Sequence, residues 1–258
     1  MTTENKSRII VALDDMDGAA AFHLARQVEG EVWGVKIGLE LFIAEGASLV
    51  IDFTNRLRLN VFLDLKLHDI PNTVARAVSR AAALRASLIN LHCSGGLQMM
   101  RAAKVALEAL HISEAFPGTP PRLLGVTVLT SLKEEDLEWV GLGGGLAGGI
   151  AMTVKKMAEA AKAAGLDGVV CSPQEIALVR GACGGNFLIV TPGCRPEWAD
   201  VNDQKRVMKP EEAVALGADY IVIGRPITKP PEKIGAPLDA VRAINSAIES
   251  ALKERNDR

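Results

Sequence analysis

The chain has 258 residues, of which 48% are hydrophobic, 23% are charged and only 4% are aromatic. This composition is typical of a soluble protein with an aliphatic core, and the length suits two small domains or one α/β barrel. The formal net charge of −2 excludes a general attraction to nucleic acid or to an anionic membrane, so a local cluster must hold any anion that binds.

Short runs of Val, Ile and Leu alternate along the chain with segments of helical periodicity. The predicted strands are 8–14, 32–38, 60–66, 87–93, 123–129, 168–172, 187–191 and 220–224. Each is almost continuously apolar, which is typical of parallel strands covered on both faces. The clearest predicted helices are 18–30, 72–86, 154–165, 209–218 and 237–255. Several of them close on glycine or a charged turn, as helix C-termini do.

Eight strands with intervening helices predict a (β/α)8 TIM barrel, and a doubly wound open sheet is the alternative. No linker or composition break divides the chain, so we expect a single domain, 1–258. The glycine-rich segment 141–149 lacks a following GK[ST] and is interpreted as a flexible connector rather than a phosphate loop. The long polar segment 192–210 follows the seventh predicted strand and is a candidate active-site lid.

Neither a secretory leader nor a membrane span is expected. The first ten residues contain no apolar core, and no apolar run reaches transmembrane length. The cysteines form no CxxC pair, and no histidine is placed to complete a zinc site with them; they are Cys93, Cys171, Cys183 and Cys194. We therefore predict reduced thiols, a cytoplasmic protein and no metal site.

Polar and charged residues collect at the carboxyl ends of the predicted strands, where barrel enzymes have their active sites. The candidates are Asp14, Lys36, Asp64, Lys66, Thr130, Arg195 and Arg225. Asp64 and Lys66 are two residues apart, so a regular strand turns both to one face. We predict that Lys36, Asp64, Lys66 and Asp69 form a chain of alternating charges, because charges removed from water are costly unless paired. The alternative is a purely structural ion-pair network at the barrel mouth.

A second candidate cluster lies near the last strand. Barrels often bind phosphate with the loops after strands seven and eight. Gly224 would let the backbone N–H approach an anion, and Arg225 would supply a bidentate fork. Arg195 and Gln204 on the preceding segment favour an anion site over a solvated arginine in a tight turn.

Two adjacent pairs are weaker candidates. A nucleophilic pair of His92 and Cys93 is disfavoured, because neighbours on a strand point to opposite faces. The same alternation disfavours Asp14 with Asp15 as metal ligands, and a turn or helix cap at residues 15–17 is the preferred interpretation.

The stretch DLKLHDIPNT, 64–73, resembles the active-site signature of the orotidine 5′-monophosphate decarboxylase family. Further blocks resemble that family in its order, namely VALD, VKIG, VTVLTS, TPGCRP, DQKR and VIGRPIT, and together they extend from Asp14 to Thr228. The Asp-x-Lys-x-x-Asp core alone is less specific. Related metal-dependent phosphosugar synthases and decarboxylases share it, although HDIPNT is not expected in them.

The resemblance implies a (β/α)8 homodimer with shared active sites and neither cofactor nor metal. It implies conversion of orotidine 5′-monophosphate to uridine 5′-monophosphate and carbon dioxide, the last step of de novo pyrimidine synthesis. A metal-dependent phosphosugar enzyme is one alternative. A catalytically inactive barrel that binds a nucleotide is another, although such a protein has no need of Lys66 beside two acids.

The resemblance also implies a role for each matching residue. Lys66 would be the proton donor, and Asp64 would lie beside the substrate carboxylate. Asp69 would act across the dimer. The remaining substrate contacts would be Lys36 and Asp14 at the ribose, Thr130 near the pyrimidine, Gln204, Gly224 and Arg225 at the phosphate with Arg195 flanking it, and Thr73 at the end of the signature.

Overall fold

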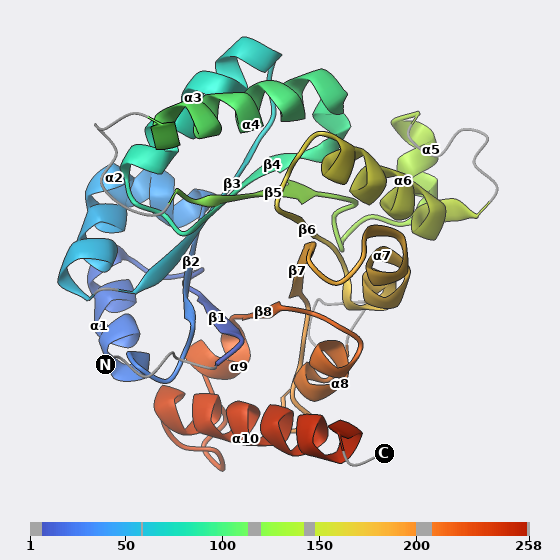
Figure 1. The fold of residues 1–258 in the computed structure, drawn as a ribbon. Helices are drawn as coiled ribbons and strands as arrows, with labels where there is room; N and C mark the ends of the chain where they lie inside the picture. The colour runs from blue at the N-terminus through green and yellow to red at the C-terminus, as the bar shows by residue number, and fades with distance from the viewer. Residues whose placement is uncertain (1–6, 58, 113–119, 142–147, 200–207, 257–258) are drawn as a thin grey trace.

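Eight parallel strands close into a barrel in the computed structural model, which describes residues 7–57, 59–112, 120–141, 148–199 and 208–256 (Figure 1). The strands are β1 (Ile9–Ala12), β2 (Gly34–Gly38), β3 (Asn60–Leu67), β4 (Leu88–His92), β5 (Arg122–Val126), β6 (Gly168–Val170), β7 (Leu188–Pro192) and β8 (Tyr220–Ile223). Each strand pairs with the next along the chain, and β8 pairs with β1. The predicted (β/α)8 barrel is therefore confirmed, and the open sheet is excluded.

The helices form a ring outside the barrel (Figure 1). In the described residues they are α1 (Gly18–Val28), α2 (Leu39–Arg56), α3 (Pro71–Ala83), α4 (Gly96–Ile112), α5 (Glu134–Trp139), α6 (Gly149–Ala163), α7 (Ile176–Cys183), α8 (Pro210–Ala215), α9 (Arg225–Thr228) and α10 (Pro237–Asn256), with 3-10 turns η1 (Cys93–Gly95) and η2 (Pro173–Glu175). The five helices predicted from periodicity are present with shifted ends. Among the described helices, none combines the length and apolar character needed to cross a bilayer.

Local signals explain where several helices begin. Asp17 caps α1, since its Oδ1 accepts a hydrogen bond from the Ala20 amide at 2.8 Å. The expected helix cap in residues 15–17 is thus confirmed. Pro71 and Pro210 occupy the first turn of α3 and α8, where a missing amide hydrogen costs nothing.

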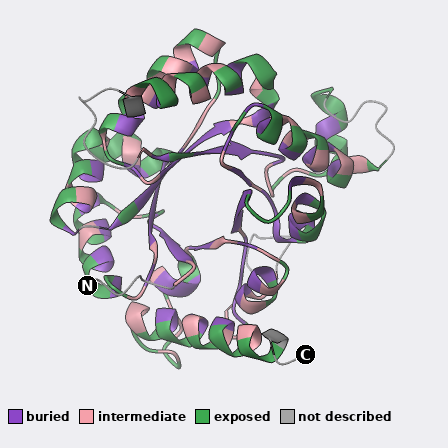
Figure 2. Cartoon of the chain, viewed as in Figure 1, coloured by how far each residue is buried: buried purple, intermediate pink, exposed green. Residues whose placement is uncertain are grey.

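Alternating strand residues supply two apolar layers, and the strands are buried on both faces (Figure 2). In β1, Ile9 and Val11 pack with the helices, whereas Ile10 and Ala12 belong to a separate cluster. That second cluster consists mainly of strand residues and fills the barrel interior, namely Ile10, Ala12, Phe62, Leu88, Leu124, Leu188, Val190 and Val222. Beyond this interior cluster, toward the carboxyl ends of the strands, side chains can line a polar cavity.

The sequence contains two segments that do not fit a short loop, a glycine-rich connector and a candidate lid. The centre of the glycine-rich connector, 142–147, lies outside the described residues, and α6 begins at its last glycine, Gly149. In the segment 192–210, residues 200–207 also lie outside the described part. Its two ends lie side by side, because the Arg195 amide donates to the Met208 carbonyl at 2.9 Å. The role of this segment as a lid stays a prediction.

Candidate active site

Four charged side chains form a continuous chain of ion pairs at the carboxyl ends of β1, β2 and β3. The Nζ atom of Lys36 lies 2.8 Å from Oδ1 of Asp14 and 3.4 Å from Oδ2 of Asp64. The other oxygen of Asp64 lies 2.7 Å from Nζ of Lys66. Lys36 and Asp64 are only 8% and 7% exposed, so each needs its oppositely charged neighbours. The predicted alternating chain therefore exists, with Asp14 as its outer member.

Within one subunit, Asp69 forms no part of this chain of ion pairs. The prediction that Asp69 joins Lys36, Asp64 and Lys66 is therefore wrong for the single subunit. Its side chain is exposed, and Oδ1 accepts a hydrogen bond from the Ile70 amide at 2.6 Å. Ile70 has φ −59° and ψ 152°, the extended conformation that a following proline favours. Asp69 consequently lies in a turn at the rim, outside the ion-paired cluster.

Lys66 meets Asp64 for a reason that strand alternation does not supply. Lys66 has φ +51°, in the left-handed region that non-glycine residues seldom occupy. The pairing of β3 with β4 also shifts register between Leu63 and Leu67. The expected contact is thus confirmed, but the same-face argument behind it was wrong, because β3 is irregular where Lys66 leaves it.

Asn90 is a site residue that the sequence did not reveal. It is fully buried on β4, and its Nδ2 donates to Oδ1 of Asp64 at 2.6 Å. Its own Oδ1 accepts a hydrogen bond from the Lys66 amide at 2.8 Å. The available signal was a lone amide in the apolar run of residues 87–93, at a position where Val, Ile or Leu is expected.

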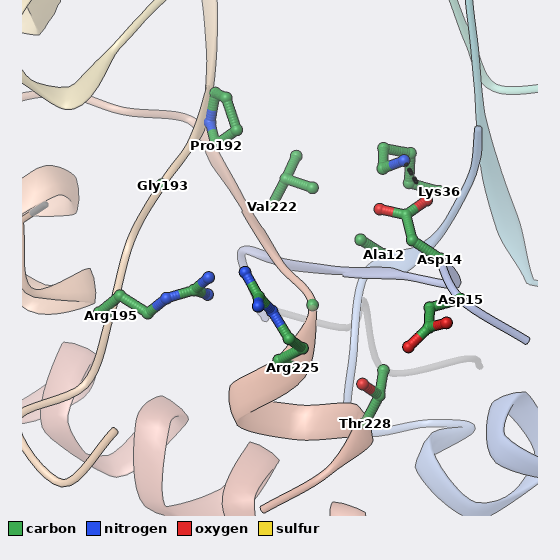
Figure 3. A pocket seen from close by; sticks show the side chains of 11 residues that line it. Ala12, Asp14, Asp15, Lys36, Pro192, Gly193, Arg195, Val222, Arg225 and Thr228 are labelled. Atoms are coloured by element: carbon green, nitrogen blue, oxygen red, sulfur yellow. Dashed lines mark hydrogen bonds and ion pairs between the residues drawn. The ribbon is translucent and has the colours of Figure 1, made fainter. Parts of the chain in front are cut away.

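Two arginines line a cavity of about 450 Å³ next to the charged chain (Figure 3). Arg195, only 7% exposed, follows β7, and Arg225 is the first residue of α9, one position beyond Gly224. Both extend toward the cavity opposite Asp14 and Lys36 (Figure 3). The predicted grouping of Arg195, Gly224 and Arg225 is confirmed, whereas Gln204 lies outside the described residues.

A second cavity of about 250 Å³ borders Asp64, Lys66 and Thr130. It shares lining residues with the arginine cavity, namely Asp14, Lys36, Pro192 and Val222. The two cavities therefore adjoin and form one elongated site. Thr73 lies in the first turn of α3 and does not line either of these cavities.

The environment of Cys93 excludes the alternative of a nucleophilic pair formed by His92 and Cys93. Burial raises the pKa of the Cys93 thiol to about 12, so the thiol stays protonated near neutral pH and is a poor nucleophile. Burial also lowers the pKa of His92, and the nearby His68 and Lys66 act in the same direction. All four cysteines are free and buried, as expected for reduced thiols.

The fold and the site together define a (β/α)8 barrel in which an acid–lysine cluster adjoins an arginine-lined cavity. A family model described as the orotidine 5′-phosphate decarboxylase / HUMPS family matches residues 7–237, and the chain belongs to this family.

Individual relatives agree with this family. The chain is 45% identical to a Glaesserella parasuis protein named orotidine 5′-phosphate decarboxylase, over 94% of this chain and 99% of the relative. It is 46% identical to a Haemophilus ducreyi protein of the same name, with the same shares covered. The crystal structure of orotidine 5′-phosphate decarboxylase from Lactobacillus acidophilus is similar with a TM-score of 0.78 at 34% identity, covering 94% of this chain and 99% of that one.

Proposed function

We propose that this enzyme converts orotidine 5′-monophosphate to uridine 5′-monophosphate and carbon dioxide, the last step of pyrimidine nucleotide synthesis. The observation that carries the proposal is the elongated cavity with Lys66 and Asp64 at one end and Arg195 and Arg225 at the other. The family description names HUMPS beside the decarboxylase, and relatives 45% and 46% identical that bear the decarboxylase name favour the nucleotide substrate.

The shape and charge of the cavity suggest how the nucleotide lies in it. The phosphate dianion binds at Arg225 and Arg195, because guanidinium groups form short, charge-assisted hydrogen bonds with phosphate oxygens. The ribose lies in the shared middle part beside Asp14 and Lys36, which offer an acceptor and a donor to its hydroxyls. The pyrimidine then reaches the inner end, beside Lys66 and Thr130.

The chemistry follows from the charge that decarboxylation creates. When the bond from C6 to the carboxylate breaks, carbon dioxide leaves and the electron pair stays on C6. The Lys66 ammonium stabilises this developing carbanion and then transfers a proton to C6. Asp64 holds the ammonium in place through its 2.7 Å contact. Binding energy from the remote phosphate helps to fix the pyrimidine against Lys66.

We further propose a cytoplasmic homodimer in which each active site receives Asp69 from the partner subunit. In favour of this assembly, Asp69 is exposed, and the neighbouring apolar residue Ile70 is 66% exposed. An exposed apolar residue beside an acid at the rim suits a contact with a second subunit. Free, buried cysteines suit a reducing compartment.

An ultraviolet assay with orotidine 5′-monophosphate tests the activity directly. We expect conversion to uridine 5′-monophosphate at the same rate with and without a chelator of divalent metals. Loss of turnover on chelation would favour a metal-dependent phosphosugar enzyme instead. Tight binding of the nucleotide without conversion would indicate an inactive, nucleotide-binding barrel.

A further inference from the structure

Asn90 contacts both members of the acid–lysine pair, although it carries no charge itself. We propose that Asn90 is a positioning residue that fixes Asp64 and Lys66 in their reactive arrangement. This inference rests on the proposed decarboxylation, in which the Lys66 ammonium must be held beside one carbon atom of the substrate.

The donor side of the Asn90 amide acts on Asp64. Oδ1 of Asp64 accepts from Asn90 Nδ2 at 2.6 Å and from Lys66 Nζ at 2.7 Å, while Oδ2 faces Lys36 Nζ at 3.4 Å. Three donors on three neighbouring strands thus determine how the carboxylate is turned. Without the amide, the carboxylate keeps, among the described residues, its two flexible lysine partners and can rotate between them.

The acceptor side of the amide acts on the backbone of Lys66. Between the pairs Leu63–Ile89 and Leu67–Leu91, β3 advances four residues while β4 advances two. The regular ladder is interrupted in this interval, and the Lys66 amide donates to the Asn90 side chain at 2.8 Å. This bond holds Lys66 at φ +51°, a strained conformation that the surroundings must stabilise.

The two contacts also determine the orientation of the Asn90 amide. A carboxylate oxygen requires a donor and a backbone N–H requires an acceptor, so Nδ2 must face Asp64 and Oδ1 must face Lys66. An apolar residue satisfies neither group, and an ionised acid satisfies only the Lys66 amide. The side chain is 0% exposed, so water cannot readily take its place.

Asn90→Ala removes both contacts and is the first test. We expect kcat to fall by about a hundredfold, because small displacements of a reacting group carry losses of that order. The dissociation constant of uridine 5′-monophosphate should change less than about threefold, since the phosphate contacts are untouched. Thr191→Val is the matched control. Thr191 is also 0% exposed, and its hydroxyl donates to the Cys171 carbonyl at 2.7 Å, away from Asp64 and Lys66.

Asn90→Asp tests the positioning role through the pH dependence of kcat, which a purely structural role of Asn90 would leave unchanged. The introduced carboxyl would face Asp64 and Lys66 on β3, and the other titratable groups nearby are Lys36 on β2 and His92 on β4 itself. Burial and the Asp64 charge would raise the pKa of this carboxyl. When protonated it can donate to Asp64 and accept from Lys66, as the amide does. We therefore expect kcat, relative to wild type at each pH, to be highest at acidic pH and to fall as pH rises.

The Lys66 amide provides a measurement independent of turnover. Hydrogen exchange at this amide should accelerate in Asn90→Ala and stay slow in Thr191→Val. The proposal is overturned if Asn90→Ala keeps wild-type kcat, if both variants lose kcat equally, or if Asn90→Asp keeps the wild-type pH profile. Unchanged exchange at Lys66 overturns it as well. A wild-type enzyme that does not decarboxylate the nucleotide, with exchange changed as expected, refutes the proposed function and leaves the structural contacts of Asn90 intact.

Discussion

The ammonium group of Lys66 lies 2.7 Å from Oδ1 of Asp64, and the two side chains differ in exposure, at 30% for the lysine and 11% for the acid. Asp64 is therefore the more buried of the two, and Lys66 is the group that a ligand in the cavity can contact more readily. This asymmetry suits a lysine that touches substrate and an acid that holds it.

Replacing Lys66 by alanine should nearly abolish turnover, to less than a few per cent of the wild-type kcat, because the only proposed proton donor is removed. Binding of uridine 5′-monophosphate, measured by calorimetry, should stay close to wild type. Lys104→Ala is a suitable control, since Lys104 is also ion-paired, to Asp167 at 3.0 Å, but lines neither of the two cavities. Substantial turnover by Lys66→Ala would rule out its role as the proton donor.

Replacing Arg225 by alanine should lower kcat/KM at least about tenfold, since a hydrogen bond to a charged group contributes roughly 1.5–3 kcal/mol. A substrate analogue without the phosphate should be little affected by the same change. Arg242→Ala serves as the control, because Arg242 pairs with Glu31 at 2.9 Å and does not line the arginine cavity. Equal losses with both substrates would assign Arg225 a structural role instead.

Mixing two inactive variants should restore activity if Asp69 acts in the partner's site. Lys66→Ala and Asp69→Ala chains are each expected to be nearly inactive alone. After random exchange of equal amounts, about half of the dimers are mixed, and one site of each mixed dimer is intact, so about a quarter of all sites should be active. If mass spectrometry shows exchange but no activity returns, Asp69 does not act across subunits.

The burial of His92 should make stability depend on pH. Burial lowers the pKa of His92 below the 6.5 of an exposed histidine, so below this pH the unfolded chain binds more protons at that position than the folded one. The contribution of His92 to the free energy of unfolding should therefore decrease as pH falls from about 6.5 toward the lower folded-state pKa. Urea unfolding over this range should give a smaller pH slope for His92→Gln than for wild type. Identical slopes would contradict the assignment.

The sequence by itself determined the barrel and most of its charged site. Continuous apolar strands require cover on both faces, which specifies the architecture without knowledge of any contact. Because parallel strands in a barrel present their carboxyl ends at one rim, the sequence places Lys36, Asp64 and Lys66 at that rim, together with Arg195 and Arg225.

Only the tertiary structure decided the details that depend on contacts between distant segments. The left-handed backbone at Lys66 arises from the register shift between β3 and β4, which periodicity within one strand does not encode. Asn90 resembles an ordinary strand residue until β3 folds against it and presents a carboxylate and a free N–H at the same place. Asp14 extends the ion-paired chain at its Lys36 end, whereas Asp69, expected at the Lys66 end, lies exposed in the turn after β3.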